Sequence, residues 1–251
     1  MKDSAKQTAF EITKFFEGGR YDAIAGNYDG QILSVGALQW NVGQGTLFPL
    51  IVRSWELDPD GFRKIFGAST DLIVSAARRE DRQVFLDMLD GKLVKRDWKL
   101  RWQRWGTHFQ ELQRTFGAEP YHKKALGIVE AFKFKSTRAY AWAFDLAVQN
   151  GGMGRIMQTA LRAIEALRSG SEREKLQHLT ELRGRLVREE FRRAYMNRKL
   201  AIVNGHGRVN GVWVDVDRMF GLSDEPWFYE EEPNPHTARG HFDNPPAGVG
   251  E

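Results

Sequence analysis

FFEGGRYDAIAGNYDGQILSVGALQWNVGQGTL, residues 15–47, carries the strongest structural signals of this sequence. An amphipathic helix over residues 5–17 leads into the stretch, and Gly18 and Gly19 end that helix. Turn residues and alternating apolar positions follow, which is typical of short strands joined by turns over about residues 24–46. The stretch therefore predicts a small β-hairpin or sheet directly after the first helix.

The rest of the chain has helical periodicity almost throughout. Thr46 is predicted to cap a helix over residues 47–55, with Pro49 in its first turn. Further helices are predicted near residues 59–66, 69–77, 79–89, 92–116, 120–134, 136–149, 153–168, 171–203 and 214–220, with a Gly-rich turn or hairpin over 204–213. The expected fold class is α+β and mostly α. We expect a folded domain over residues 1–222 and an acidic tail, rich in Pro and Gly, over residues 223–251.

The composition excludes several kinds of site. The 251 residues include no Cys, so neither a disulfide nor a thiol nucleophile is available. The six His, among them His206 in its Gly-rich turn, lack metal-ligand spacing, and we expect no metal and no cofactor. No run approaches the roughly 20 apolar residues of a membrane span, and the first residues lack the apolar segment of a secretory signal. We therefore expect synthesis in the cytoplasm without a signal peptide.

Two carboxylates are the candidate catalytic groups of residues 15–47. Glu17 lies at the predicted helix end, where the helix dipole and the neighbouring Phe15 and Phe16 disfavour its ionised form, as suits a general acid. Asp29 lies in a Tyr-Asp-Gly turn, and Asp22 is a weaker alternative. One protonated and one ionised carboxylate in a shared cleft are what hydrolysis of a glycosidic bond requires.

Polar and aromatic side chains surround Asp29 in the sequence. Hydroxyls, amides and an aromatic face are the groups that recognise a sugar. The candidates for substrate binding are Tyr28, Gln39, Trp40, Asn41 and Thr46, and Ser34 is a candidate for assisting Asp29.

These residues resemble the catalytic segment of the lysozyme superfamily. Glu17 and the run YDGQILSVGALQWNVGQGTL are most similar to the family 46 glycoside hydrolases, the chitosanases, and to related phage and secreted-effector muramidases. The resemblance implies that Glu17 is the acid and Asp29 the base, and that Ser34 replaces a Thr that orients the attacking water. GALQ, residues 36–39, also resembles a stretch of goose-type lysozymes and lytic transglycosylases whose Gln lies in the sugar groove. The Glu-to-Asp interval is shorter here than in the chitosanases.

The resemblance also implies a cleft between two lobes. The run RAYAWAFDLAVQNGG, residues 138–152, is similar to a chitosanase helix, which would place Asp145 and Asn150 beside the cleft. A core helix is the alternative interpretation. Aromatic residues that recur with helical spacing over residues 98–116 are predicted to belong to the core.

The charge distribution favours an anionic substrate. Residues 92–104 hold six basic residues against one acid, and residues 155–199 hold twelve against six. We therefore expect a muramidase that cleaves the β-1,4 glycan strands of peptidoglycan by acid/base hydrolysis with inversion. The alternatives are a chitosanase, a lytic transglycosylase, and a non-catalytic module that binds cell wall or nucleic acid, although the enzyme is not expected to have nucleic acid as a partner. Cleavage of the cell wall would require a holin or a secretion machine to deliver the protein to the periplasm. If the protein is a secreted effector, we expect an immunity protein as its partner.

Overall fold

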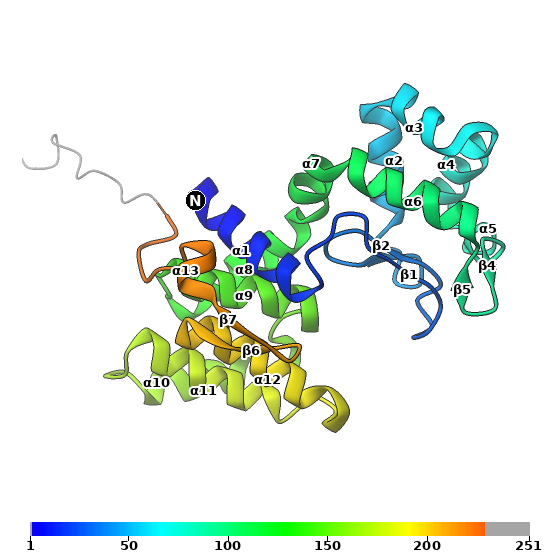
Figure 1. The fold of residues 1–251 in the computed structure, drawn as a ribbon. Helices are drawn as coiled ribbons and strands as arrows, with labels where there is room; N and C mark the ends of the chain where they lie inside the picture. The colour runs from blue at the N-terminus through cyan, green and yellow to red at the C-terminus, as the bar shows by residue number, and fades with distance from the viewer. Residues whose placement is uncertain (1, 229–251) are drawn as a thin grey trace, which may run out of the picture.

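The computed structural model describes residues 2–228 and shows two groups of elements with α1 (Asp3–Phe16) between them (Figure 1). One group contains the small sheet and the helices up to α7. The other contains α8 to α13 and packs against α1. The fold is mostly α, with small antiparallel sheets, as the sequence predicts.

The sheet near the N-terminus has three strands of two residues each. They are β1 (Ile24–Ala25), β2 (Ser34–Val35) and β3 (Trp40–Asn41), antiparallel in the order β1-β2-β3. Val35 pairs with Trp40, and Ser34 pairs with Asn41. Successive residues of a strand face opposite sides, so this register places Ser34 and Asn41 on one face and Val35 and Trp40 on the other.

The smaller group of helices surrounds an aromatic core. Its elements are α2 (Phe48–Leu57), α3 (Pro59–Phe66), α4 (Thr70–Arg79), α5 (Gln83–Leu86), β4 (Leu89–Asp90), β5 (Leu93–Val94), α6 (Arg96–His108) and α7 (Gln110–Leu112). Trp102 and Trp105 on α6 are fully buried, and the Trp105 indole N–H donates to Ser54 Oγ of α2 at 3.0 Å. The aromatic stripe is therefore core, as predicted, although Trp98 is half-buried and Phe116 is exposed.

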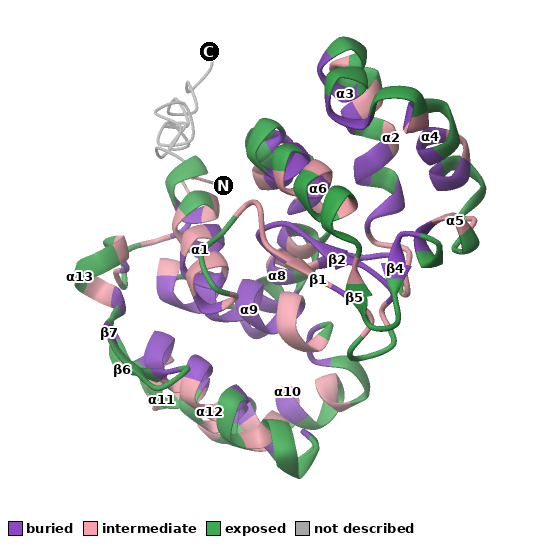
Figure 2. Cartoon of the chain, turned by 45° about the vertical axis from the view of Figure 1, so that its right-hand side comes forward, coloured by how far each residue is buried: buried purple, intermediate pink, exposed green. Residues whose placement is uncertain are grey.

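The larger group is built around α9 (Thr137–Asn150), which is buried on nearly all sides (Figure 2). Ser136 caps its start by accepting from the N–H of Ala139 at 3.0 Å, and Gly151 ends it with a φ of 70°. Helices α1, α8 (Glu119–Phe132), α11 (Glu172–Gly184) and α12 (Glu189–Asn204) pack on it. The group is completed by α10 (Met157–Ala166), the hairpin β6 (His206–Val209) and β7 (Val212–Asp215), and α13 (Val216–Phe220).

Several predicted elements have other boundaries in the structure. The helix predicted over residues 171–203 is broken into α11 and α12 by residues 185–188. Residues 79–89 form only the short α5 before the β4–β5 hairpin, and residues 92–116 are divided among β5, α6, α7 and a π-helical turn, Gln113–Gly117. Thr46 does not cap α2, because its hydroxyl accepts from the N–H of Asn41 at 2.8 Å.

The first residues of the predicted tail belong to the folded body. Trp227 is buried, and its indole N–H donates to the carbonyl of Phe134 at 3.0 Å. The N–H of Arg138 donates to the carbonyl of Ser223 at 3.0 Å. The remainder of the predicted tail, residues 229–251, lies outside the described residues.

Candidate active site

A cavity of about 960 Å³, here called the cleft, brings together most of the predicted site residues. It is lined by the end of α1, the β1–β3 region and the helices α8, α9, α11 and α12. Seven of the nine predicted residues are among those that line it: Glu17, Asp29, Ser34, Gln39, Asn41, Thr46 and Asn150. Segments more than 100 residues apart in the sequence therefore meet at one site.

Glu17 lies directly after α1, where Gly18 and Gly19 turn the chain away with φ values of 104° and 75°. Its side chain is 23% exposed, and its Oε1 accepts from Nη1 of Arg198 at 2.6 Å. The Arg198 guanidinium also lies 5.5 Å from the ring centroid of Phe16. Among residues 2–228, Oε2 makes no side-chain hydrogen bond, so one carboxyl oxygen is anchored and the other is available to a substrate.

A buried charge cluster holds Arg198 in place from behind. Its Nη2 donates to Oδ1 of Asp145 at 2.5 Å, and Lys199 Nζ donates to Oδ2 of the same carboxylate and to Gln149 Oε1 at 2.9 Å. Burial opposes ionisation of Asp145, but the charges of Arg198 and Lys199 outweigh it and lower the pKa of Asp145 to about 2. Burial lowers the pKa of Lys199 to about 8. Asp145 thus supports the cleft without lining it.

Asp29 has very different surroundings. It is exposed in the loop between β1 and β2, and its Oδ1 accepts from the N–H of Gln31 at 3.2 Å. This is a local turn that leaves the carboxyl group in contact with water. The alternative Asp22 does not line the cleft, and its carboxylate makes two hydrogen bonds to Arg20, at 2.9 and 2.8 Å, which lower its pKa.

The polar residues of the β1–β3 region are held by one another. Asn41 Oδ1 accepts from the N–H of Gln44 at 2.7 Å, and the Thr46 hydroxyl binds the N–H of Asn41. Gln39, in a left-handed conformation with a φ of 56°, donates through Nε2 to the carbonyl of Gly36 at 2.9 Å. Ser34 is buried on β2 and lines the cleft.

Unpartnered polar atoms are concentrated at the cleft. Six buried side-chain atoms lack a hydrogen-bond partner within residues 2–228, and four of them belong to residues that line the cleft. These four are Gln31 Oε1, Asn150 Oδ1, Tyr195 Oη and Arg198 Nε. A buried polar group without a partner destabilises the fold by roughly 1–3 kcal/mol, so their concentration points to a ligand that offers many hydrogen-bonding groups.

Two predicted substrate-binding residues do not line the cleft. Trp40 is buried, its indole N–H donates to the carbonyl of Gly117 at 3.1 Å, and the ring packs against Gly36 and Gly117. The strand alternation explains the difference, because Asn41 faces the cleft and its neighbour Trp40 must then face the core. Tyr28 is 63% exposed and lies outside the lining. Neither residue is placed to stack on a sugar in the cleft.

The cleft also contains basic residues that the sequence did not single out. Lys124, Arg183, Arg188 and Arg198 line it, against the two acids Glu17 and Asp29. In the sequence they occupy positions that are typical of solvent-exposed helix faces. Only the folded chain brings them to one place. The lining therefore carries a positive balance.

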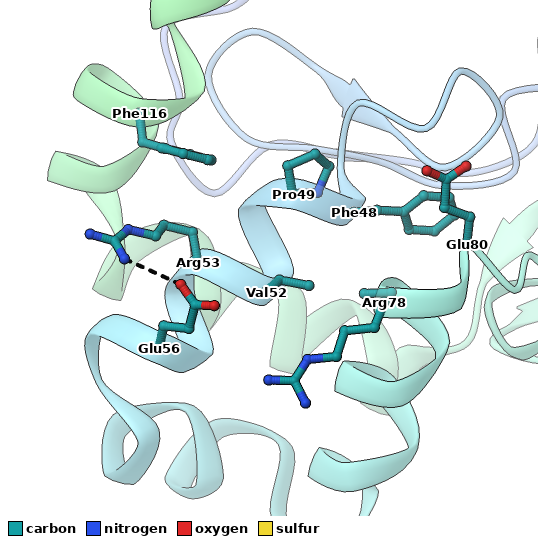
Figure 3. Close-up of a pocket in the computed structure, with 9 residues that line it drawn as sticks. Phe48, Pro49, Val52, Arg53, Glu56, Arg78, Glu80 and Phe116 are labelled. Carbon is teal, nitrogen blue, oxygen red and sulfur yellow. Dashed lines mark hydrogen bonds and ion pairs between the residues drawn. The ribbon is translucent and has the colours of Figure 1, made fainter.

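A second groove, of about 610 Å³, lies mainly between α2 and α4 (Figure 3). Its two acids are Glu56, which is paired with Arg53 at 3.2 Å, and Glu80, at the end of α4. It contains none of the predicted catalytic residues and belongs to one group of helices. The candidate chemistry therefore lies in the cleft and not in this groove.

Residues 2–228 contain no group of three or more His, Cys, Asp or Glu side chains arranged to hold a metal ion. Over the same residues, no helix has the length and apolar character needed to cross a membrane.

Comparison with known proteins identifies the fold. No protein-family model matches this sequence, and no curated protein matches it. A mutant chitosanase from Bacillus subtilis MY002, complexed with 6 GlcN, matches with a TM-score of 0.61 at 16% identity, over 84% of this chain and 97% of that chain. The native chitosanase from the same source matches with a TM-score of 0.59 at 16% identity, over 85% of this chain and 99% of that chain. The predicted fold class is thereby confirmed: the chain has the mostly α, lysozyme-like fold of these chitosanases.

Proposed function

We propose that this protein is a glycoside hydrolase of β-1,4-linked amino-sugar polymers and acts as a muramidase on peptidoglycan. The observation that carries the proposal is that Glu17 and Asp29, from different elements, line one cleft with Ser34 and several amide side chains. Two carboxylates in such a cleft can divide the acid and base roles of glycoside hydrolysis. The shared fold of the chitosanases supports the reaction class.

In the proposed reaction, Glu17 protonates the glycosidic oxygen through Oε2 while Arg198 holds Oε1. Asp29 takes a proton from a water molecule, whose oxygen attacks the anomeric carbon as the bond from that carbon to the protonated glycosidic oxygen breaks. The leaving sugar departs with a hydroxyl group, and the Ser34 hydroxyl helps to orient the water. The product is inverted at the anomeric carbon. Inversion requires the two carboxyl groups to lie about 6.5–9.5 Å apart, which leaves room for the water.

The charge of the cleft favours peptidoglycan over chitosan. Chitosan is a polycation. Arg198 is paired with Glu17 and Asp145, and the other basic side chains of the lining, Lys124, Arg183 and Arg188, would repel chitosan more strongly than Asp29 would attract it. Peptidoglycan carries carboxylates on its stem peptides and on the muramic acid residues that lack a stem peptide. The chitosanase alternative is kept because a structural neighbour is complexed with 6 GlcN. A lytic transglycosylase, which needs only the Glu, becomes the better description if Asp29 is dispensable.

Product analysis tests the proposal. Purified peptidoglycan is incubated with the wild-type protein, with Glu17→Gln and with Glu11→Gln, and the products are identified by mass spectrometry. Glu11 is the matched control, since it lies on the same helix, pairs with Lys14 and does not line the cleft. We expect reducing muramic ends from the wild type and from Glu11→Gln, and none from Glu17→Gln.

Other products would revise the proposal in defined ways. Anhydro-sugar ends would identify a transglycosylase. Products from chitosan but not from peptidoglycan would identify a chitosanase. If neither polymer gave products, a non-catalytic wall-binding module would replace the hydrolase.

A further inference from the structure

The corner between α11 and α12 presents apolar side chains to the cleft. Residues 185–188 interrupt the helical run, and Leu186, Val187 and Phe191 line the cavity. Leu186 is 44% exposed and Phe191 is 51% exposed. Large apolar groups that remain exposed inside a cleft are typical of a surface that is covered by a ligand.

Two arginines lie at the same corner. Arg183, in the last turn of α11, and Arg188, which precedes α12, both line the cleft. Arg183 has no carboxylate partner among residues 2–228, and its Nε reaches the carbonyl of Gly152 only at 3.5 Å. Arg188 lies 4.7 Å from the ring centroid of Phe191 and pairs with the exposed Glu190 at 3.3 Å. Guanidinium groups in such positions are suited to bind a carboxylate.

A buried hydroxyl at this wall gives independent support. Tyr195, on α12, is fully buried and lines the cleft, and its Oη has no hydrogen-bond partner within residues 2–228. Burial raises the pKa of Tyr195, so the hydroxyl stays protonated and can donate. A donor without an acceptor, on the wall of a cleft that Arg183 and Arg188 also line, points to an oxygen-rich group as the missing ligand.

We propose that this corner is the subsite for the carboxylate-ended 3-O-substituent of an amino sugar. In this subsite, Arg183 and Arg188 bind the carboxylate, and Leu186 and Phe191 contact the apolar atoms of the substituent. Muramic acid carries such a group, either as a free lactyl carboxylate or extended by a stem peptide, whereas glucosamine and N-acetylglucosamine lack it. The inference rests on the proposed function, since it names the residues that select peptidoglycan among amino-sugar polymers.

The test measures binding and needs no turnover. The Glu17→Gln protein is titrated by calorimetry with three probes: N-acetylglucosamine–N-acetylmuramic acid oligomers without peptides, the same oligomers with stem peptides, and neutral N-acetylglucosamine oligomers of equal length. Arg183→Gln/Arg188→Gln is then added in the same background. The control is Arg185→Gln/Arg193→Gln, which removes the same charge from two exposed positions that do not line the cleft.

We expect the Arg183→Gln/Arg188→Gln pair to weaken binding of the muramic probes by about 10- to 100-fold, as the loss of charged hydrogen bonds implies. Binding of the neutral oligomer and binding by the control pair stay unchanged. A loss confined to the peptide-bearing probe assigns the peptide carboxylate, and a loss with both muramic probes assigns the lactyl carboxylate. Equal losses for neutral and anionic probes, no loss at all, or an absence of binding to every probe would each overturn the subsite.

The two proposals fail in different ways. Selective binding without any product from the wild-type protein would refute hydrolysis and leave the subsite standing. Products from peptidoglycan with no selective loss in the Arg183→Gln/Arg188→Gln protein would refute the subsite and leave the hydrolase standing.

Discussion

Glu17 and Asp29 line the same cleft but are held in opposite ways. Glu17 depends on Arg198, which lies 181 residues further along the chain and is itself anchored on buried Asp145. Asp29 depends on the N–H of Gln31, two residues away, and remains exposed. One side of the site is thus positioned by tertiary structure and the other by local turn chemistry. Removing the buried groups that hold Glu17 in place should therefore lower stability, whereas changes to Asp29 should alter activity alone.

The largest expected effect is a loss of activity on changing Asp29. Asp29→Asn should lower kcat on peptidoglycan by about 10²- to 10⁴-fold, the range for loss of a general base, because an amide cannot take a proton from water. The turn should persist, since an Asn side-chain oxygen can accept from the N–H of Gln31 as the Asp does. The measurement pairs steady-state kinetics with urea unfolding, and the unfolding midpoint should equal that of the wild type.

Either of two results would contradict this comparison. A large fall in the unfolding midpoint would show that Asp29 is structural. Full activity would remove Asp29 from the base role and favour a mechanism that uses Glu17 alone.

Asp145, on the side of Glu17, gives the converse prediction, which is a loss of stability. Asp145→Asn leaves Arg198 and Lys199 buried without their shared counter-charge. Removing one partner of a buried ion pair typically lowers the free energy of unfolding by about 3–5 kcal/mol. Urea unfolding measures the loss, and Glu165→Gln, which breaks an exposed pair with Arg168, serves as a control that should leave the midpoint unchanged.

Asp145 also predicts how stability depends on pH. Its pKa falls from an ordinary 3.8 to about 2 in the folded chain. A depressed carboxyl pKa contributes stability that is complete above pH 3.8 and is lost as the pH falls to about 2; such a group contributes on the order of 2 kcal/mol. Unfolding followed at a series of acidic pH values should show this slope, and Asp145→Asn should lack it.

His122 affects the pH dependence of stability over a higher pH range than Asp145 does, so the two contributions can be measured separately. Its ring is buried, with Nδ1 2.8 Å from the Tyr140 hydroxyl, and burial lowers its pKa from 6.5 to about 3. Protonation in the unfolded chain therefore removes stability as the pH falls below 6.5. His122→Gln should flatten the curve between pH 6.5 and 4, and an unchanged slope there would show that another group is responsible.

The sequence predicts the residues held by local turns better than it predicts the residues that hold Glu17 through tertiary contacts. The end of α1 at Glu17, the short strands, and the positions of Asp29, Ser34 and Asn41 all follow from turn and periodicity signals within residues 15–47. Arg198 and Lys199 give no such signal. They occupy ordinary positions in a basic helical segment, and their role arises only because α12 packs on α9 and on the end of α1.

The sequence does not predict the break between α11 and α12, for a related reason. Residues 185–188 contain neither Pro nor Gly, and the one glycine beside them, Gly184, is tolerated inside a helical pattern, so periodicity predicts one continuous element. Packing of Tyr195 and Met196 against Gly184 instead brings the two helices together around this corner. The side chains that the break presents to the cleft could not be identified before the tertiary contacts were known.

Trp40 supplies the smallest expected effect and a direct test of the strand register. A two-residue strand gives too little alternation to show from sequence which face is buried, and only the pairing of Val35 with Trp40 places the indole in the core. Trp40→Phe removes the hydrogen bond to the carbonyl of Gly117 and part of the buried ring, and should lower the free energy of unfolding by about 1–2 kcal/mol with KM unchanged. Gln44→Ala alters an exposed side chain that lines the cleft. It should instead raise KM a few-fold, because it removes about one hydrogen bond to the substrate, and should leave the unfolding midpoint unchanged. If Trp40→Phe raised KM and left stability intact, the ring would face the substrate and the register of β2 and β3 would have to shift by one residue.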